Sequence, residues 1–349
     1  MTQDLIKRGI EMKKKLLVAA AASLVVAPVF AQSNVKIYGI VDAGIGYGKA
    51  GDTTFNGVVS GPYSAPRIGF KGSEDLGGGL KAEFALEQGF SIDTGAPASA
   101  TRQFHRQAWV GLSGDFGSVG LGRQYAPGYN YSLKFSQAVP GATFNSQAFL
   151  TNSIPGASIQ PGTDARWDNS ITYKLPKMGA FSAEAIYSFQ TAESGDDRGQ
   201  DDKMGVAAAY AAGPVTVGAI YHNSRRAKDN LKEIYLGGTM DFGVAKLSAS
   251  YQTAKENGVV DAQVAYLGVV VPVGKGKIHA DIGRLSDDEN ADNDSTSLSL
   301  AYTYGLSKRT TVYVMANRTT NDDNAARGVL ATDDGAASTS LAAGLRHTF

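Results

Sequence analysis

The sequence contains no cysteine, which excludes a disulfide framework, a thiolate zinc site and a catalytic thiol. It also lacks an excess of one charge, because 33 basic residues balance 33 acidic ones, so a strongly basic nucleic-acid binder is not expected. Beyond the N-terminal segment no apolar run reaches the roughly 18 residues of a membrane helix, which excludes a helical membrane protein. Alternating strands can still cross a membrane, because only one of their faces meets lipid.

The N-terminal segment has the three parts of a secretory signal. Lys13–Lys15 precede the uncharged stretch Leu16–Ala31, which ends in a small-residue cleavage pattern. A short buried helix is the alternative, but it explains neither the positive flank nor the cleavage pattern. We therefore expect residues 1–31 to be a signal peptide, with Met12 as an alternative start. Residues 32–349 are then one exported domain.

The rest of the chain repeats a segment of about ten residues in which large apolar residues alternate with small or polar ones. In residues 80–87 the leucines and the phenylalanine share one face, whereas Lys81, Glu83 and Glu87 share the other. A second face that is full of charged and hydroxyl groups does not fit the core of a soluble sandwich. Periodicity alone leaves open which face meets lipid, since a soluble barrel shows the same alternation.

Two kinds of connector alternate strictly between these segments. The short ones are rich in glycine, proline or aspartate, which favour turns for backbone reasons. They are Glu74–Gly79, Gly114–Gly117, Leu175–Gly179, Ala211–Pro214, Asp241–Val244, Pro272–Gly276 and Gly305–Lys308. The longer, polar ones are centred near residues 55, 95, 145, 196, 227, 257, 290 and 328.

Seven turns and eight loops join sixteen strands, with the turns at one rim and the loops at the other. A sheet that spans a membrane must also close, because an open edge leaves backbone groups unpaired in lipid. The sequence therefore predicts an all-β fold, a 16-stranded antiparallel transmembrane β-barrel. Its last strand is expected to pair with its first, Val35–Tyr47.

Six stretches that run from the first predicted strand to the last match a known family. They are Val35–Asp42, Arg67–Glu83, Arg106–Ser113, Phe116–Gln124, Arg166–Tyr173 and Gly344–Phe349. On these motifs the sequence resembles the general porins of Gram-negative outer membranes, especially the β-proteobacterial type. The resemblance implies an outer-membrane homotrimer with short periplasmic turns, long extracellular loops and a third loop folded into the barrel. It also implies passive diffusion of small hydrophilic solutes, contact with outer-membrane lipid and lipopolysaccharide, and recognition of Phe349 by the barrel-assembly machinery.

In this family, cationic side chains on the barrel wall face the inward-folded loop. Matching the motifs residue by residue assigns this place to Arg67, Arg106 and Arg166. Alternation independently puts Arg67 and Arg166 opposite the apolar face, where a charge is solvated by the lumen instead of buried in lipid. One hypothesis is that these arginines are solvated wall residues without a role in selectivity. The sharper reading is a basic strip that favours anions, by the logic of charged rings in pores.

The third loop, from Tyr125 to Thr163, is 39 residues long, and its only charged residue is Lys134. Many general porins carry acidic residues there, so this chain departs from the family pattern. The predicted constriction also has acids and bases from the strands. The basic residues predicted on the inner face are Arg67, Lys71, Lys81, Arg102, Arg106 and Arg166, and the acidic ones are Glu83, Glu87 and Asp168. Six against three predicts an anion preference, although a one-residue slip of register would move every member to the other face.

The sequence offers no support for an enzyme, a cofactor site or a specific metal site. None of its four histidines has a His-x-x-x-His or Glu-x-x-His partner, and no phosphate-binding loop or Gly-x-Ser-x-Gly motif is present. Acidic runs in the outer loops are usual for a solvated face, with divalent-cation binding as their functional alternative. Two other functions stay open, a substrate-specific anion channel and a surface adhesin or antigen whose pore is incidental.

Overall fold

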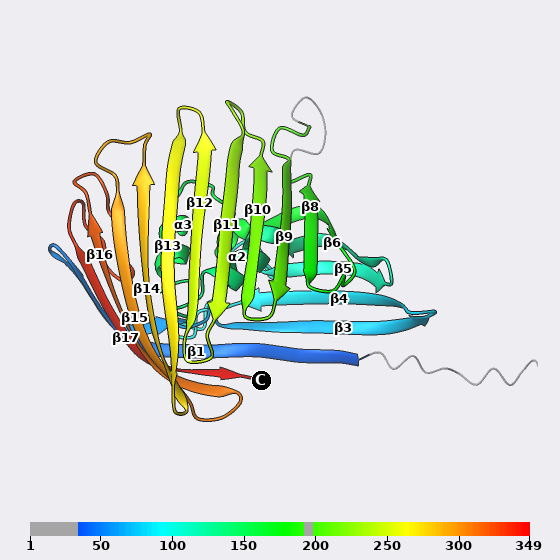
Figure 1. Cartoon of the computed structure of the whole chain (residues 1–349), viewed down its shortest axis with the longest axis horizontal. Coiled ribbons are helices and arrows are strands. Elements are labelled where there is room, and N and C mark those ends of the chain that lie inside the picture. The colour runs from blue at the N-terminus through cyan, green and yellow to red at the C-terminus, as the bar shows by residue number, and fades with distance from the viewer. Residues whose placement is uncertain (1–33, 192–197) are drawn as a thin grey trace, which may run out of the picture.

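The computed structural model describes residues 34–191 and 198–349, so the predicted signal peptide, residues 1–31, lies outside the described residues. In the described part, one antiparallel sheet curls around the two helices α2 (Pro127–Phe135) and α3 (Ser146–Asn152) (Figure 1). No helix in these ranges is both long enough and apolar enough to span a membrane.

The sheet contains seventeen hydrogen-bonded segments, each antiparallel to its neighbours. They are β1 (Asn34–Ala50), β2 (Thr53–Ser60), β3 (Arg67–Gly77), β4 (Leu80–Gly89), β5 (Gln107–Gly114), β6 (Gly117–Tyr125), β7 (Arg166–Lys174), β8 (Phe181–Ser188), β9 (Lys203–Ala212), β10 (Val215–Ser224), β11 (Leu231–Asp241), β12 (Lys246–Glu256), β13 (Val260–Val273), β14 (Gly276–Asp287), β15 (Ser295–Gly305), β16 (Thr310–Asn321) and β17 (Ser338–Thr348).

The first and last strands pair and close the barrel, as predicted. Their register runs from Ile40 opposite Thr348 to Ala50 opposite Ser338. Phe349 extends the ladder, because its backbone N–H donates to the Gly39 carbonyl at 3.1 Å and its carbonyl accepts from the Gly39 N–H at 3.2 Å. A Cβ on Gly39 would lie 2.3 Å from the Phe349 ring, so the missing side chain makes room for that ring.

Seventeen segments form sixteen barrel strands, because β2 and β3 are two halves of one strand. β2 pairs with Ala43–Ala50, and β3 pairs with Asn34–Ile40 on the same edge of β1. Between the halves, Pro62 and Pro66 have no backbone N–H to give to a ladder, so the chain leaves the sheet there. The predicted 16-stranded antiparallel barrel is therefore confirmed.

The seven turns lie where the sequence predicts them, but two of the eight expected long connectors are tight. The chain reverses at Gly51–Asp52, and the residues around position 55 belong to β2. Gly51 has a φ of +53°, which suits a two-residue hairpin turn. The connector near residue 257 contains only residues 257–259. Polarity misled the prediction here, because a hairpin that projects into solvent is as polar as a loop.

The exposure of the side chains shows which face of the sheet points outward. Val110 and Leu112 of β5 are 57% and 44% exposed, whereas Ser297 and Ser299 of β15 are fully buried. Large apolar side chains therefore cover the outside, and hydroxyl and charged groups face the inside. This arrangement is the reverse of a soluble barrel and resolves the ambiguity that periodicity leaves.

The segment between β6 and β7, residues 126–165 and hereafter L3, lies inside the barrel. Pro127 opens α2 at a position where a helix needs no N–H donor. The Phe135 ring of α2 packs at 6.3 Å from the ring of Tyr235. Gly218 and Gly237 of the wall leave room for it, since a Cβ on either would lie 2.6 Å from Phe135. L3 thus fills one side of the lumen.

A second apolar contact holds the other helix of L3. The side chain of Asn145 caps α3 by accepting from the Ala148 N–H at 2.9 Å. Leu150 of α3 is fully buried in one apolar cluster with Val264 of β13 and Leu285 of β14. Val264 and Leu285 thus interrupt the polar lining at a place that α3 covers.

We expect Phe135→Ala to lower the free energy of unfolding by about 3–5 kcal/mol, because it leaves a cavity between α2 and the wall. The midpoint of guanidinium unfolding, followed by intrinsic fluorescence in detergent, measures the change. Phe242→Ala is the matched control, because Phe242 is 54% exposed in a turn, and it should cost less than about 1 kcal/mol. Equal midpoints for the two variants would contradict the packing role of Phe135.

Candidate functional site

A cavity of about 800 Å³ runs through the barrel between L3 and the opposite wall. Its lining includes residues of β3, β7, β14 and β17, the connector before β5, and L3 itself. Six lining residues are basic: Arg67, Arg106, Arg166, Lys246, Lys277 and Arg346. Among the described residues, the lining contains one carboxylate, that of Asp241. The open path through the barrel is therefore basic.

Two of the predicted arginines share one buried carboxylate. Arg106 Nε lies 2.6 Å from Glu87 Oε1, and Arg67 Nε lies 3.8 Å from Glu87 Oε2. Tyr125 and Tyr38 also donate hydroxyl hydrogen bonds to Glu87, at 2.7 Å and 2.9 Å. A single negative charge thus faces two positive ones, which leaves this group with a net positive charge.

Arg166 lies across two stacked tyrosine rings. Tyr125 and Tyr129 are parallel within 9°, with ring centres 3.9 Å apart. The Arg166 guanidinium is 5.2 Å and 5.4 Å from these centres, and its Nη1 donates to the Gly162 carbonyl at 2.9 Å. In the described part of the chain Arg166 forms no ion pair, and its buried Nε has no hydrogen-bond partner. Its charge is therefore not neutralised by a carboxylate.

A fourth arginine, which the sequence analysis missed, holds this group together. The register of β6 against β7 shifts between Gly122 and Gln124, and Gly122 has a φ of +128°. Strict alternation would put Arg123 on the outer face with Leu121, but the bulge turns Arg123 inward. The signal that would have found it is Gly122, since glycine inside a strand often marks a bulge.

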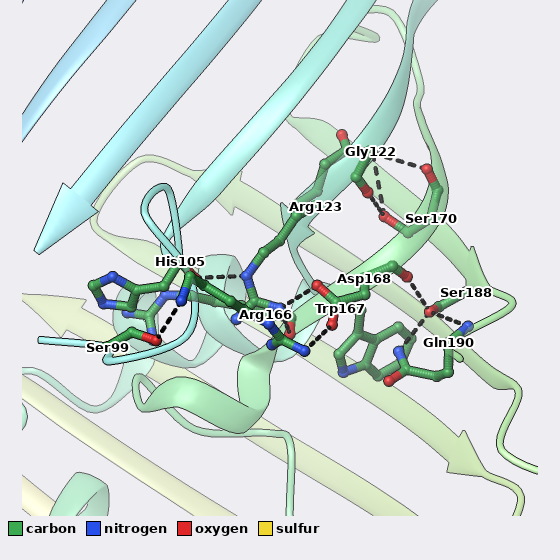
Figure 2. Close-up of polar contacts among 12 residues, drawn as sticks. Ser99, His105, Gly122, Arg123, Arg166, Trp167, Asp168, Ser170, Ser188 and Gln190 are labelled. Carbon is green, nitrogen blue, oxygen red and sulfur yellow. Dashed lines mark hydrogen bonds and ion pairs between the residues drawn. The ribbon is translucent and has the colours of Figure 1, made fainter. Parts of the chain in front are cut away.

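Figure 2 shows the Arg123 side chain extending toward His105 and Arg166, which both line the cavity. Its Nε donates to the His105 carbonyl at 2.6 Å, and its Nη1 donates to the Arg166 carbonyl at 3.1 Å. The same Nη1 pairs with Asp168 Oδ1 at 2.6 Å, and Asp168 also pairs with Arg102 at 2.9 Å. Arg123 therefore fixes the backbone at both positions.

The sequence analysis places Arg67, Arg106, Arg166, Lys81, Glu83, Glu87 and Lys134 at the constriction, and the structure brings together Arg67, Glu87, Arg106 and Arg166. Lys81 and Glu83 lie on β4 nearer the turns, with Glu83 about 13 Å along the strand from Glu87. Lys134 lies in the last turn of α2, with its Nζ 3.8 Å from the centre of the Tyr131 ring, and it lines a separate hollow. These three side chains do not join the arginines.

Carboxylates of the wall, instead of acids in L3, connect the loop to the barrel. Glu233 of β11 is fully buried and accepts from the backbone N–H groups of Ser158 and Ile159, at 2.8 Å and 3.0 Å. Glu184 of β8 is also buried and accepts from the Asn130 side chain at 2.9 Å. These carboxylates bind neutral donors of the loop, so they do not neutralise the basic lining.

Asp281 of β14 makes the third connection of this kind. It accepts from the Asn145 side chain at 2.9 Å and from the backbone N–H groups of Val139 and Ser146 at 3.2 Å each. The sequence analysis did not find these acids, because nothing local shows which wall carboxylate will meet a loop that is distant in sequence.

The described residues contain no group of three or more histidine or carboxylate side chains that could hold a metal ion. Acids at the end of β14 and in the connector that follows it instead bond within the protein. Asp287 accepts from Asn293 at 2.6 Å, and Asp294 pairs with Arg284 at 2.9 Å. The divalent-cation alternative thus has no support from their arrangement.

Known proteins share both the sequence pattern and the fold. The family described as "Gram-negative porin" matches residues 17–324. Outer membrane porin protein 32 of Delftia acidovorans is 33% identical over 96% of this chain and 100% of its own length. An outer membrane porin protein of Bordetella pertussis is 29% identical, over 97% of this chain and 100% of its own length.

Two solved structures show the same architecture. An anion-selective porin from Comamonas acidovorans superposes with a TM-score of 0.74 at 29% identity, over 91% of this chain and 100% of that one. The trimer form of OmpT, an outer membrane protein of Vibrio cholerae, gives a TM-score of 0.66 at 17% identity, over 91% and 99%. The second likeness concerns the fold alone.

We expect Arg123→Ala to lower the free energy of unfolding by about 2–4 kcal/mol, because two carbonyls and the Asp168 carboxylate lose a donor. The guanidinium midpoint in detergent measures this loss. Arg318→Ala is the control, since Arg318 is exposed and bonds only the Thr339 hydroxyl, and it should change stability by less than about 0.5 kcal/mol. A midpoint for Arg123→Ala as high as that of the control would refute the linking role.

Proposed function

Because this chain belongs to the family of Gram-negative porins, we propose that it passes small hydrophilic solutes by diffusion and prefers anions. It is an outer-membrane porin with a closed β-barrel, and porins are channels, not enzymes. The observation that carries the preference is the lining of the main cavity, where six basic residues face one carboxylate.

The bonding of the wall acids supports the same preference. Glu184, Glu233 and Asp281 are buried behind L3 and are occupied by its donors. Arg166, Lys246 and Lys277 have no ion-pair partner among the described residues. Fixed positive charges along a narrow path lower the barrier for anions and raise it for cations. The anion-selective porin from Comamonas acidovorans, which shares this fold, is consistent with this proposal.

The proposal extends to the assembly and its surroundings. We infer a homotrimer, supported by the trimer form among the structural neighbours. The exposed apolar outer face fits contact with outer-membrane lipid and lipopolysaccharide. Phe349 is 45% exposed at the end of the chain, and we infer that it is the residue recognised by the barrel-assembly machinery.

We expect Arg166→Gln to lower the anion-to-cation permeability ratio by about 3–10-fold, since it removes an unpaired charge from the path. Glu87→Gln should raise the ratio by a similar factor, because it leaves Arg67 and Arg106 without their shared counter-charge. The zero-current potential of the purified protein in a planar bilayer under a salt gradient measures both. Shifts of the same sign, or none, would contradict the proposed selectivity.

Lys308→Gln is the control for these measurements, because Lys308 lies in an outward turn away from the cavity lining. It should leave the permeability ratio within the error of the parent protein. A parent potential on the cation side would overturn the anion preference while leaving the channel itself intact.

We expect a pH effect from His105, which lines the cavity in the connector before β5. Burial and the nearby charge of Arg106 lower the pKa of His105 to about 4. The ring is therefore neutral near pH 7 and gains its charge only as the pH falls through about 4. His105→Gln should match the parent potential at neutral pH and show a smaller rise in anion preference between about pH 5.5 and pH 3.5. Identical pH profiles would contradict this assignment.

A further inference from the structure

A second hollow, of about 370 Å³, opens in the wall formed by β4, β5, β6 and β7. It lies on the side of L3 that faces the turns, and Tyr125 is the one residue it shares with the arginine group among the described residues. Its main polar and aromatic lining residues are Glu83, Gln107, Trp109, Gln124, Asn130 and Thr172. The constriction described above uses none of these side chains to hold its arginines.

Two glycines form the floor of this hollow. Gly111 of β5 and Gly120 of β6 are direct cross-strand partners. A Cβ on Gly111 would lie 2.3 Å from the Val119 carbonyl oxygen, and one on Gly120 would lie 2.4 Å from Gln124 Oε1. The wall therefore has a bare patch, and the Trp109 side chain stands beside it.

The indole of Trp109 is held in place by its own strand. Its Nε1 donates to Gln107 Oε1 at 3.1 Å. Its neighbours Val110 and Leu112 are exposed on the outer face, so alternation directs Trp109 into the lumen. An ordered indole beside a bare floor offers a flat apolar surface to a solute.

Polar atoms around the indole are left without partners. Thr172 is 2% exposed, and its Oγ1 has no hydrogen bond in the described part of the chain. Gln124 and Asn130 each donate through their amide nitrogen, to Ser170 and Glu184, which leaves their amide oxygens as acceptors. A buried hydroxyl without a partner is costly in a folded protein unless water or a ligand supplies one.

The charges near the hollow balance. Glu83 forms no ion pair among the described residues, and Lys174 pairs with Glu184 at 3.6 Å. Glu83 and Lys174 are the charged residues of its lining within the described part of the chain. One acid and one base in the lining favour neither an anion nor a cation, in contrast to the basic lining of the main cavity.

We propose that this hollow binds a neutral polyhydroxylated solute of monosaccharide size. The C–H face of a pyranose ring covers the Trp109 indole, and its hydroxyls, which both donate and accept, meet Glu83, Thr172 and the free amide oxygens. The volume lies in the range of about 300–1,000 Å³ that is usual for small-molecule sites. The inference rests on the proposed diffusion function and names one solute class that the pore retains transiently.

The test is the ionic current of the purified protein in a planar bilayer, with D-glucose added to the side of the turns. We expect a current reduction that saturates with glucose concentration. Thr172→Val should raise the half-saturating concentration about 3–10-fold, the value of one hydrogen bond, and Trp109→Ala should raise it at least tenfold. Thr239→Val is the matched control, since Thr239 is a buried threonine that lines a different hollow, and it should leave the block unchanged.

A reduction that grows linearly and equals that of polyethylene glycol at the same viscosity would overturn the proposal. So would equal block in the parent, Trp109→Ala and Thr172→Val proteins. Loss of the anion-side potential in the parent protein would instead refute the proposed selectivity, so the two failures are distinguishable in one set of bilayers.

A second measurement does not depend on any variant. The chain has two tryptophans, and Trp167 is fully buried. A saturable change of tryptophan fluorescence with D-glucose therefore reports Trp109, and it should have the same midpoint as the block of current. A fluorescence that stays constant while glucose rises would overturn the site.

Discussion

The interior of this channel depends on hydrogen bonds between buried wall carboxylates and neutral amide donors of L3. Glu184, Glu233 and Asp281 are turned toward L3 and accept from its amide groups. A carboxylate that is buried behind a loop and bonded to N–H donors cannot screen a cation across the lumen. The same three carboxylates therefore hold L3 in place and, by being buried behind it, leave the open path with its positive charge. The basic lining is the side of the wall that the loop leaves uncovered.

Sequence alone predicted the strand count, the closure and the faces of Arg67 and Arg166, because each depends on alternation or on turn residues that act locally. It failed where a local irregularity or a distant contact decides the outcome. Arg123 lies inward because of one bulge at Gly122, which reverses the face that counting assigns. Arg346 lines the same cavity from β17, and its Nε bonds the Ser64 hydroxyl across the closure of the barrel. The spacing of residues in the sequence does not show that Arg346 and Ser64 lie next to each other.

The lumen is divided into three environments by what L3 covers. Where α2 and α3 pack, the wall carries apolar side chains such as Ile220 and Val264, and the helices fill the space. Along the uncovered wall the lining is basic and open. Toward the turns, between β4 and β7, the lining is balanced in charge and carries a half-buried indole. One loop thus separates a charged passage from a neutral recess within the same barrel.

The positions of the loop's partners around the circumference also have a mechanical consequence. Glu184, Glu233 and Asp281 belong to β8, β11 and β14, so three buried contacts attach L3 along one arc of the barrel wall. A barrel wall that is one sheet thick deforms easily, because small changes of angle between neighbouring strands add up around the barrel. Here a bend of the wall between β8 and β14 must stretch at least one of the contacts with L3. The contacts that position L3 therefore also stiffen the part of the wall that they join.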